Sequence, residues 1–146
     1  MLESSGYESA IFDCTHDYSI DKENLNLLNT DDFAQIAKSI LEKHSKIVSF
    51  YTMSNSFHMQ IRLAEEMKRL SSDTIIVFAG PQATLCAEEL LSTFTFIDYV
   101  AQGEGENTIV KLVSNLCSLT GDISVIPNLV YRNNCNEIKK NPTLPL

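Results

Sequence analysis

The sequence predicts an α/β fold of three layers, in which helices cover a mainly parallel sheet and a C-terminal β-hairpin completes the domain. Short apolar runs alternate along the chain with longer amphipathic segments. The runs are apolar almost throughout, which is typical of parallel strands covered on both faces. Two further short runs near the C-terminus flank an asparagine-rich turn, which is typical of a hairpin.

The candidate strands are the apolar runs. Thr74–Ala79 (TIIVFA) is the clearest of them, because it is rich in β-branched residues and stops at a Gly-Pro pair. The other runs are Ser9–Thr15, Lys46–Thr52 and Phe96–Ala101, with Asn128–Arg132 and Glu137–Lys140 as the two arms of the hairpin.

The candidate helices carry apolar residues at helical spacing. Asp31–His44 has five such residues on one face, and its first two aspartates supply the cap and a favourable charge at the helix start. Asn55–Leu70 is longer and equally amphipathic. Thr84–Leu91 and Glu106–Leu116 are predicted as shorter helices.

The amino-acid composition and the net charge limit the kinds of molecule that this chain is expected to bind. The chain has 146 residues, 44% of them hydrophobic, and a net charge of −8. An acidic surface disfavours nucleic acid and anionic membranes, since both are bound through Lys and Arg contacts to phosphate. No apolar run is long enough to span a bilayer and no secretory signal is visible, so we expect a cytoplasmic protein. The four cysteines, Cys14, Cys86, Cys117 and Cys135, form no C-x-x-C pair and are expected to be free thiols.

Three short segments follow the three best candidate strands, and they are rich in Gly, Ser, Thr and Asn. They are Tyr51–Asn55 (YTMSN), Gly80–Thr84 (GPQAT) and Gln102–Glu106 (QGEGE). Right-handed crossovers place the carboxyl ends of parallel strands along one edge of the sheet, where ligands of such sheets bind. We therefore predict a binding site made of these three loops.

The loop chemistry favours a broad neutral ligand over a nucleotide. None of the three loops contains Lys or Arg, Thr108 stands where a dinucleotide fingerprint needs its third glycine, and no Walker lysine is present. Glycines allow close approach of a ligand, and carboxylates accept hydrogen bonds from amides. Glu104 and Glu106 have the alternative role of complementing a helix dipole and securing the turn. Tyr51 either stacks on a flat ligand or belongs to the core.

A resemblance adds to these inferences. The stretches IVSFYT, IIVFAGPQAT, AEELL, FIDYVAQGEGENTI, IPNLVYR and KKNPTLPL occur in this order. Together they resemble the N-terminal cobalamin-binding domain of the B12-dependent radical SAM enzymes. The resemblance implies a Rossmann-like, flavodoxin-like fold that holds a base-off corrin on the carboxyl edge of the sheet, with no histidine ligand on cobalt. It also implies a radical SAM catalytic domain as partner, in cis or in trans.

The predicted cofactor-binding residues come from the three loops and the strand before the first of them. They are Ser49, Tyr51, Thr52 and Ser54 in the first group, Gly80, Pro81, Gln82, Ala83 and Thr84 in the second, and Gln102, Gly103, Glu104, Gly105 and Glu106 in the third. We predict no catalytic and no metal-ligating side chain. No C-x-x-x-C-x-x-C motif is present, so no iron–sulfur cluster is expected in this chain.

The sequence also departs from the family pattern. Ala79 stands where a second glycine is usual, and its methyl group either crowds a ligand or packs; Gln82 stands where histidine is common. The first strand and most of the first helix of the family are not recognisable, which leaves a sheet edge through which two copies could pair. We expect a domain over residues 1–141 and a tail over 142–146.

Two alternatives remain open from the sequence. One is a degenerate domain that keeps the fold and serves as an interaction or structural unit without the corrin. The other is a flavodoxin-like binder of FMN or another nucleotide, which the absence of a phosphate loop disfavours. His16 lies near Asp13 and Asp17, but its spacing does not match a cobalt-ligating motif, so we interpret it as a loop residue.

Overall fold

The computed structural model describes residues 2–12, 30–43, 46–118 and 121–144. Within these residues, a five-stranded sheet has the strand order β1-β2-β3-β4-β5. The first three strands are parallel, and the last two join antiparallel, as a hairpin. The predicted α/β class and the hairpin are confirmed. The strands are β1 (Ile47–Tyr51), β2 (Ile75–Ala79), β3 (Tyr99–Ala101), β4 (Leu129–Arg132) and β5 (Ile138–Lys140).

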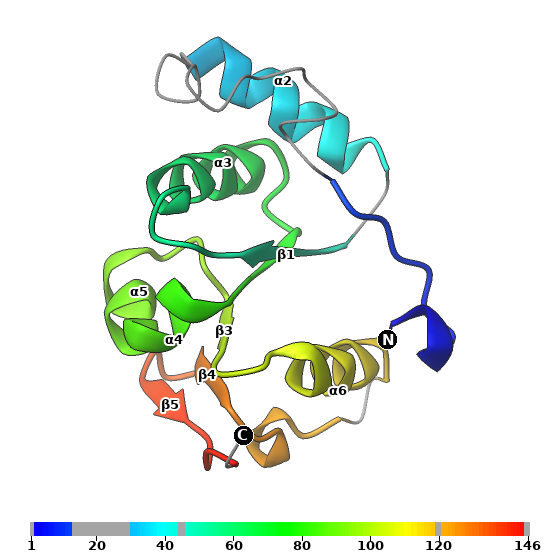
Figure 1. Ribbon diagram of the computed structural model, residues 1–146, viewed down its shortest axis with the longest axis vertical. Coiled ribbons are helices and arrows are strands. Elements are labelled where there is room, and N and C mark those ends of the chain that lie inside the picture. The colour runs from blue at the N-terminus through cyan, green and yellow to red at the C-terminus, as the bar shows by residue number, and fades with distance from the viewer. Residues whose placement is uncertain (1, 13–29, 44–45, 119–120, 145–146) are drawn as a thin grey trace.

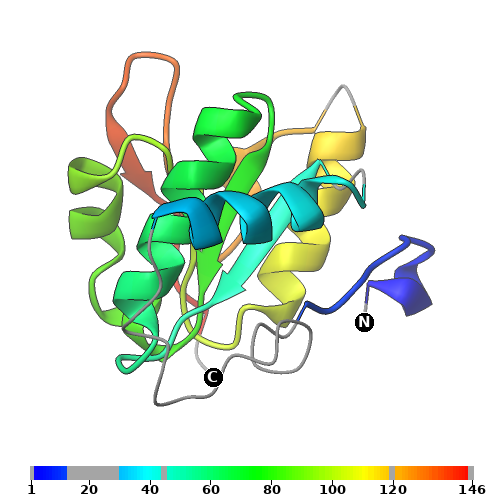
Figure 2. The ribbon, with the colours of Figure 1, turned by 90° about the horizontal axis from the view of Figure 1, so that it is seen from above.

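Helices lie on both sides of this sheet (Figures 1 and 2). α3, α4 and α5 cover one face, α6 covers the other, and α2 packs against the outer side of α3. Their bounds are α2 (Thr30–Leu41), α3 (Phe57–Leu70), α4 (Pro81–Leu85), α5 (Ala87–Thr93) and α6 (Glu106–Cys117), with short 3-10 turns at η1 (Glu3–Ser5) and η3 (Ile123–Val125).

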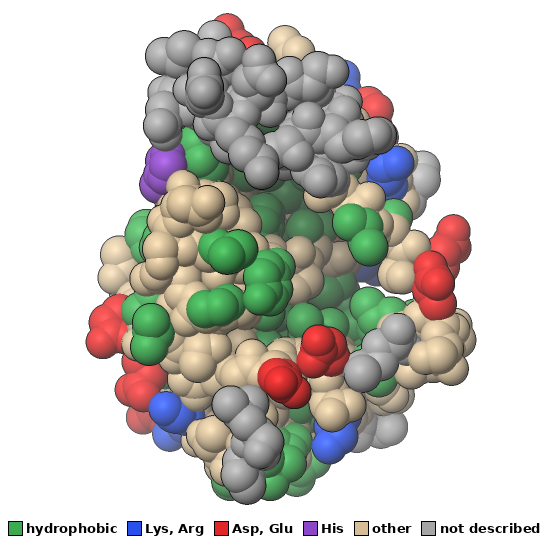
Figure 3. Space-filling model, viewed as in Figure 1, with side chains coloured by type: hydrophobic (Ala, Val, Ile, Leu, Met, Phe, Trp, Pro, Cys, Tyr) green, Lys and Arg blue, Asp and Glu red, His purple; other side chains and the backbone are tan. Residues whose placement is uncertain are grey.

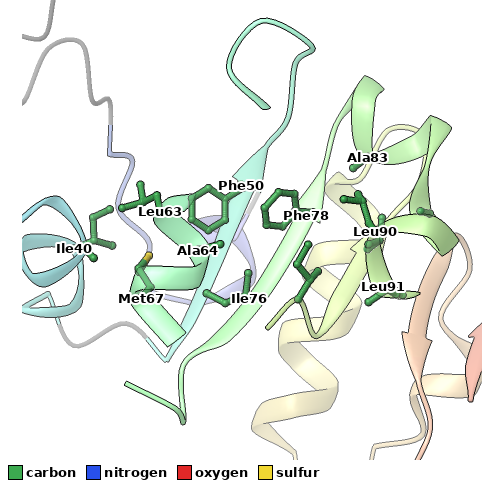
Figure 4. Packing of buried hydrophobic residues seen from close by; sticks show 14 of the residues in the cluster. Ile40, Phe50, Leu63, Ala64, Met67, Ile76, Phe78, Ala83, Leu90 and Leu91 are labelled. Carbon is green, nitrogen blue, oxygen red and sulfur yellow. The ribbon is translucent and has the colours of Figure 1, made fainter. Parts of the chain in front are cut away.

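The core is divided by the sheet into two clusters. β2 illustrates why: its side chains alternate between the faces, so Ile76 and Phe78 pack toward α3, α4 and α5, while Val77 packs toward α6 and contacts the cluster of Leu112. Phe50 of β1 and Phe78 form a tilted aromatic pair with ring centroids 5.1 Å apart, which Figure 4 shows at the centre of the larger cluster.

The second predicted loop is largely helical, which corrects the sequence-based boundaries. Gly80 adopts a φ of 97°, and α4 begins immediately afterwards at Pro81. Proline is well suited to this first helical position because its φ is already helical and its missing N–H needs no partner there. The predicted single helix Thr84–Leu91 is two helices, because Cys86 between them has φ −129° and ψ 35°.

Three other expectations need correction or lie outside the described residues. Ser9–Phe12 forms no strand, and the remainder of that run is not described. α2 begins at Thr30, so Asp31 and Asp32 lie in its first turn and are not its cap. The face of β1 opposite α3 is not covered over its whole length: α6 reaches Ile47, but Ser49 and Tyr51 are exposed.

Besides the pairing of β4 with β3, Arg132 attaches the hairpin to the rest of the domain. Its guanidinium group donates to the carbonyl oxygens of Leu91, Phe94 and Ile97, and the distances to the last two are 2.9 Å. These carbonyls belong to the end of α5 and the segment that follows it, where helical partners are no longer available. One side chain of β4 therefore completes the end of α5.

No helix among the described segments is both long enough and apolar enough to cross a membrane. Cys86, Cys117 and Cys135 are free thiols, as expected, and Cys14 lies outside the described residues.

Candidate functional site

The first and second predicted loops are joined by a buried threonine. Thr52, which has no exposed surface, donates its hydroxyl to the Ala79 carbonyl oxygen at 2.7 Å and accepts the Ala83 N–H at 3.0 Å. Next to it, the Ser54 hydroxyl donates to the Gln82 side-chain oxygen at 2.8 Å. These bonds hold the ends of β1 and β2 and the start of α4 together.

The contact between the first and second loops requires a glycine at position 80. Its φ of 97° lies in a region that L side chains rarely adopt. A Cβ atom at this position would also lie 2.9 Å from both the backbone nitrogen and the carbonyl oxygen of Thr52. Neither atom is at the end of a flexible side chain, so a larger residue would have to displace the backbone of the first loop.

The second and third loops are joined by Thr84. Its hydroxyl donates to the Gly80 carbonyl oxygen and accepts the Gly103 N–H, both at 2.9 Å. The largely buried Gln102 side chain donates to the Thr84 carbonyl oxygen at 3.1 Å. The three loops that the sequence placed at one edge of the sheet therefore form one hydrogen-bonded rim, which we call the carboxyl rim.

Gly105 contributes to packing within this rim. A Cβ atom on Gly105 would lie 3.3 Å from the Cβ of Ala79 and 3.4 Å from the Cβ of Ala101. The absent side chain therefore points at the ends of β2 and β3, where it lets α6 begin close to the sheet. The sequence left open whether the Ala79 methyl group crowds a ligand or packs in the protein. Ala79 is buried, so its methyl group packs inside the protein.

The outer surface of the carboxyl rim combines apolar and acidic groups. Tyr51 is 65% exposed, which excludes the core role that the sequence had left open for it, and Met53 and Leu85 are 51% and 82% exposed. Glu104 and Glu106 are exposed, and their side chains make no hydrogen bond or ion pair with any described residue. The turn-securing hydrogen bonds expected of them are not formed, although Glu106 does lie in the first turn of α6. Figure 3 shows a hollow on this face, with hydrophobic side chains inside it and acidic side chains on its margin.

The predicted site residues thus divide into two groups. One group is engaged inside the rim and shapes it: Thr52, Gly80, Ala83, Thr84, Gln102, Gly103 and Gly105, with Gln82 engaged in the Ser54 contact. The other group is exposed at the rim or on β1 beside it: Ser49, Tyr51, Ser54, Pro81, Glu104 and Glu106.

Leu85 and Asn128 lie outside the three predicted loops, and Met53 lies within the first loop but was not among its predicted contact residues. Asn128 has a φ of 61°, and its carbonyl oxygen accepts the Gln102 N–H at 2.8 Å, so it supports the third loop from the hairpin side. An asparagine directly after proline, before an apolar run, is a turn signal that could have indicated it. The exposure of Leu85 depends on the orientation of α4, and that of Met53 depends on the course of the loop between β1 and α3; local sequence determines neither.

The described part of the chain contains no cluster of three or more His, Cys, Asp or Glu side chains suited to a metal ion. His58, near the start of α3, is exposed, and His16 and His44 lie outside the described residues. A polar cavity of about 480 Å³ adjoins the third loop, where Glu104, Asn107, Lys111 and Asn128 are among its lining residues.

A parallel α/β sheet with a ligand rim at its carboxyl edge defines the Rossmann-like class of binding domains. Here the rim has no phosphate loop and no basic side chain among the predicted site residues. Within this class, the chain belongs to the B12 binding domain family, whose model matches residues 1–113.

Two known proteins are similar to parts of this chain. An uncharacterized methyltransferase of Pyrococcus horikoshii is 29% identical over 114 residues, which cover 78% of this chain and 24% of the relative. The cobalamin-dependent S-adenosylmethionine radical enzyme OxsB, solved with aqua-cobalamin and S-adenosylmethionine bound, superposes with a TM-score of 0.65 at 16% identity. That likeness, which covers 78% of this chain and 16% of OxsB, shows the fold. The chain therefore spans about a quarter or less of the length of these proteins.

Proposed function

We propose that this chain is a cobalamin-binding module and that the corrin lies across the carboxyl rim. One observation carries the proposal: hydrogen bonds join the three loops at the strand ends into one surface. The chain in which they do so is a member of the B12 binding domain family. The fold of OxsB, which was solved with aqua-cobalamin, supports the same assignment.

The exposed chemistry of the rim fits a corrin. A corrin is a broad macrocycle with apolar faces and a margin of amide groups. Tyr51, Met53 and Leu85 offer exposed apolar surface, while Glu104 and Glu106 offer carboxylates without competing partners among the described residues. Carboxylates are strong acceptors for amide N–H donors. The absence of Lys and Arg from the three loops fits a neutral ligand better than a phosphate.

We propose further that the corrin is held base-off and that this chain supplies no histidine to the cobalt. The single described histidine, His58, is exposed near the start of α3, and no metal-ligating cluster is present among the described residues. When bound, the corrin would supply the cobalt-centred chemistry, including methyl carriage, and the protein would supply binding and orientation. Rim residues such as Thr52 and Thr84 would fix the surface, and the exposed residues would contact the ligand.

The catalytic step would be carried out by a radical SAM domain, in cis or in trans. The proposal rests on OxsB and on the methyltransferase relative, each of which is far longer than the matched region. In this arrangement, residues 1–141 would form the corrin module and residues 142–146 its C-terminal tail, in which Pro142 and Leu144 are hydrogen-bonded to Asn128.

Absorbance titration with aquacobalamin, followed by ultrafiltration, tests the proposal. We expect the protein fraction to retain the red colour in a saturable manner and to retain no FMN under the same conditions. Electron paramagnetic resonance of the reduced cob(II)alamin complex tests the base-off state, since a nitrogen ligand on cobalt splits the cobalt lines. A folded sample that retains no cobalamin would instead identify the chain as a domain that keeps the fold without the cofactor.

A further inference from the structure

The polar cavity of about 480 Å³ beside the third loop lies between the first two turns of α6 and the turn that precedes β4. Small-molecule sites usually have volumes of about 300–1,000 Å³, and this cavity falls within that range. It adjoins the carboxyl rim, the surface that we propose for the corrin. Its lining residues are Glu104, Asn107, Thr108, Lys111, Pro127, Asn128 and Leu144.

Hydrogen bonds hold the walls of this cavity in place. The buried Thr108 hydroxyl donates to the Pro127 carbonyl oxygen at 3.0 Å, which fixes α6 against the turn. The Asn128 side-chain oxygen accepts the Leu144 N–H at 2.8 Å, and the Asn128 N–H donates to the Pro142 carbonyl oxygen at 3.1 Å. The C-terminal segment is thereby held against the same turn, so the cavity is preformed.

Three exposed polar side chains that line the cavity have no partner among the described residues. The Glu104 carboxylate, the Asn107 amide and the Lys111 ammonium group make no hydrogen bond or ion pair with them. Glu104 and Lys111 carry opposite charges and line the same cavity, yet they do not pair with each other. The cavity therefore offers an acceptor and a cationic donor that a ligand can engage without breaking an existing contact.

These groups follow one another along α6. Glu104 lies just before the helix, at the rim, and Asn107 is in its first turn. Lys111 lies one turn further on, about 6 Å along the helix axis from Asn107. Residues four apart in a helix share a face, so both side chains line the cavity. A ligand that fits this order presents an N–H donor at the rim and an anionic group further from it.

Cobalamin carries this combination in one of its side chains. At the corrin margin, that side chain continues through a secondary amide, whose N–H is a donor, into a phosphodiester and then into the nucleotide base. The phosphodiester is anionic, and lysine is a common partner of such groups. In the base-off form the base is not attached to cobalt, so this nucleotide arm is free to extend away from the macrocycle.

We propose that the cavity receives the nucleotide arm, with Lys111 bound to the phosphodiester and Glu104 bound to the amide N–H. Lys111 then makes the module specific for cobalamin over corrins that lack the phosphate. This inference rests on the proposed function, since it needs the corrin to lie on the carboxyl rim. It also explains the placement of charge. The three loops, which would meet the macrocycle, contain no Lys or Arg, whereas a lysine follows on α6.

A tethered phosphodiester fits this cavity better than a free phosphate. One lysine and one amide give few contacts, and the carboxylate of Glu104 disfavours a free anion nearby. An arm that the corrin already holds at the rim has a high effective concentration at the cavity, so few contacts suffice to bind it.

Three corrins that differ in this arm test the inference. Aquacobalamin has the whole arm, cobinamide phosphate lacks the base, and cobinamide lacks both phosphate and base. Absorbance titration of the full chain gives a dissociation constant for each. Lys111→Met should weaken the binding of the two phosphate-bearing corrins by roughly threefold to tenfold and leave that of cobinamide within about twofold. Lys111→Arg keeps the charge and should retain most of the affinity.

Lys38→Met is the matched control, because it removes an exposed lysine of α2 that does not line the cavity. It should leave all three dissociation constants within about twofold of the parent. Excess inorganic phosphate at matched ionic strength should not weaken the binding of aquacobalamin. A fall to the affinity of Lys111→Met would overturn the inference and assign the cavity to a free anion.

The outcomes separate this inference from the proposed function. If the parent binds all three corrins and Lys111→Met binds them equally well, or more weakly by the same factor, the inference fails and the proposed function stands. If the parent, shown to be folded by circular dichroism, binds none of the three, the proposed function fails and the inference fails with it.

Discussion

Two turns of the carboxyl rim occupy equivalent places in the fold but have different physical roles. Each follows a parallel strand, contains a glycine with positive φ and leads into a helix. The turn after β2 lies against Thr52, and its Gly80 has no room for a side chain. The turn after β3 carries two exposed glutamates whose side chains make no hydrogen bond or ion pair with any described residue. The first turn is therefore constrained by the fold, whereas the acidic residues of the second are not.

This difference indicates where function and stability separate within one rim. Residues whose polar atoms are engaged in the protein report on folding when they are changed. Residues that the fold leaves unengaged can be changed with little effect on folding, so their effect on ligand uptake is directly interpretable.

Gly80→Ala should have the largest effect. The φ of 97° and the 2.9 Å approach to the Thr52 backbone both disfavour a Cβ atom, so we expect a loss of about 3 kcal/mol in the free energy of unfolding. Urea denaturation followed by circular dichroism measures it. Gly6→Ala is the control for positive φ alone, because Gly6 has a φ of 84° but no atom within 4 Å of its added Cβ. A loss equal to that of Gly6→Ala would show that the Thr52 contact is unimportant.

Thr52→Val should have the second largest effect on stability. Valine has nearly the same shape but leaves the buried Ala83 N–H without its acceptor, so we expect a loss of about 2 kcal/mol. Thr93→Val, on the exposed surface of α5, is the control and should change stability by less than about 0.5 kcal/mol. Equal stabilities of the two variants in urea would contradict the role assigned to Thr52.

Gly105→Ala should have a smaller effect. The added methyl group would lie 3.3–3.4 Å from two alanine methyl groups, and Gly105 has an ordinary φ of −60°. The tight contact and the reduced entropy of the unfolded chain oppose each other, so the net change should stay below about 1 kcal/mol. Thermal unfolding measures it, and a loss as large as that of Gly80→Ala would erase the proposed difference between the two turns.

Glu104→Gln and Glu106→Gln should leave stability within about 0.5 kcal/mol of the parent. If the carboxylates bind the amide margin of a corrin, each change should weaken cobalamin uptake by roughly threefold to tenfold, because charge-assisted hydrogen bonds are the stronger ones. Glu65→Gln and Glu89→Gln, exposed on α3 and α5, are matched controls. Uptake that falls equally in all four variants would indicate a general effect of net charge.

Much of the fold could be predicted because its signals are local. The β-branched run of β2, the helical spacing in α3 and the asparagine-rich hairpin turn each depend on neighbouring residues, and each was placed within a few residues. The break at Cys86 and the early start of α4 could not be predicted in this way. The start of α4 is held by Thr52, which is distant in sequence and accepts the N–H groups of Gln82 and Ala83.

The candidate site shows the same limit. Glycine and small polar residues at strand ends indicated the three loops correctly, and the structure brings them together. Sequence alone did not reveal which polar groups bind other parts of the protein. Thr52 and Ser54 belong to the same loop, yet one is buried under the rim and the other is exposed at it. The exposure of Tyr51 was equally undecided, because it depends on how far α6 extends over β1.

The three hydrogen bonds from Arg132 to backbone carbonyls determine where a shortened version of this domain can end. The family match ends at residue 113, but the segment after α5 is completed by a side chain from β4. A stop codon placed at the end of the match would leave the carbonyls of Leu91, Phe94 and Ile97 without their shared donor, and the sheet without its hairpin. The smallest autonomous unit should therefore include Arg132 and the strand that pairs with it.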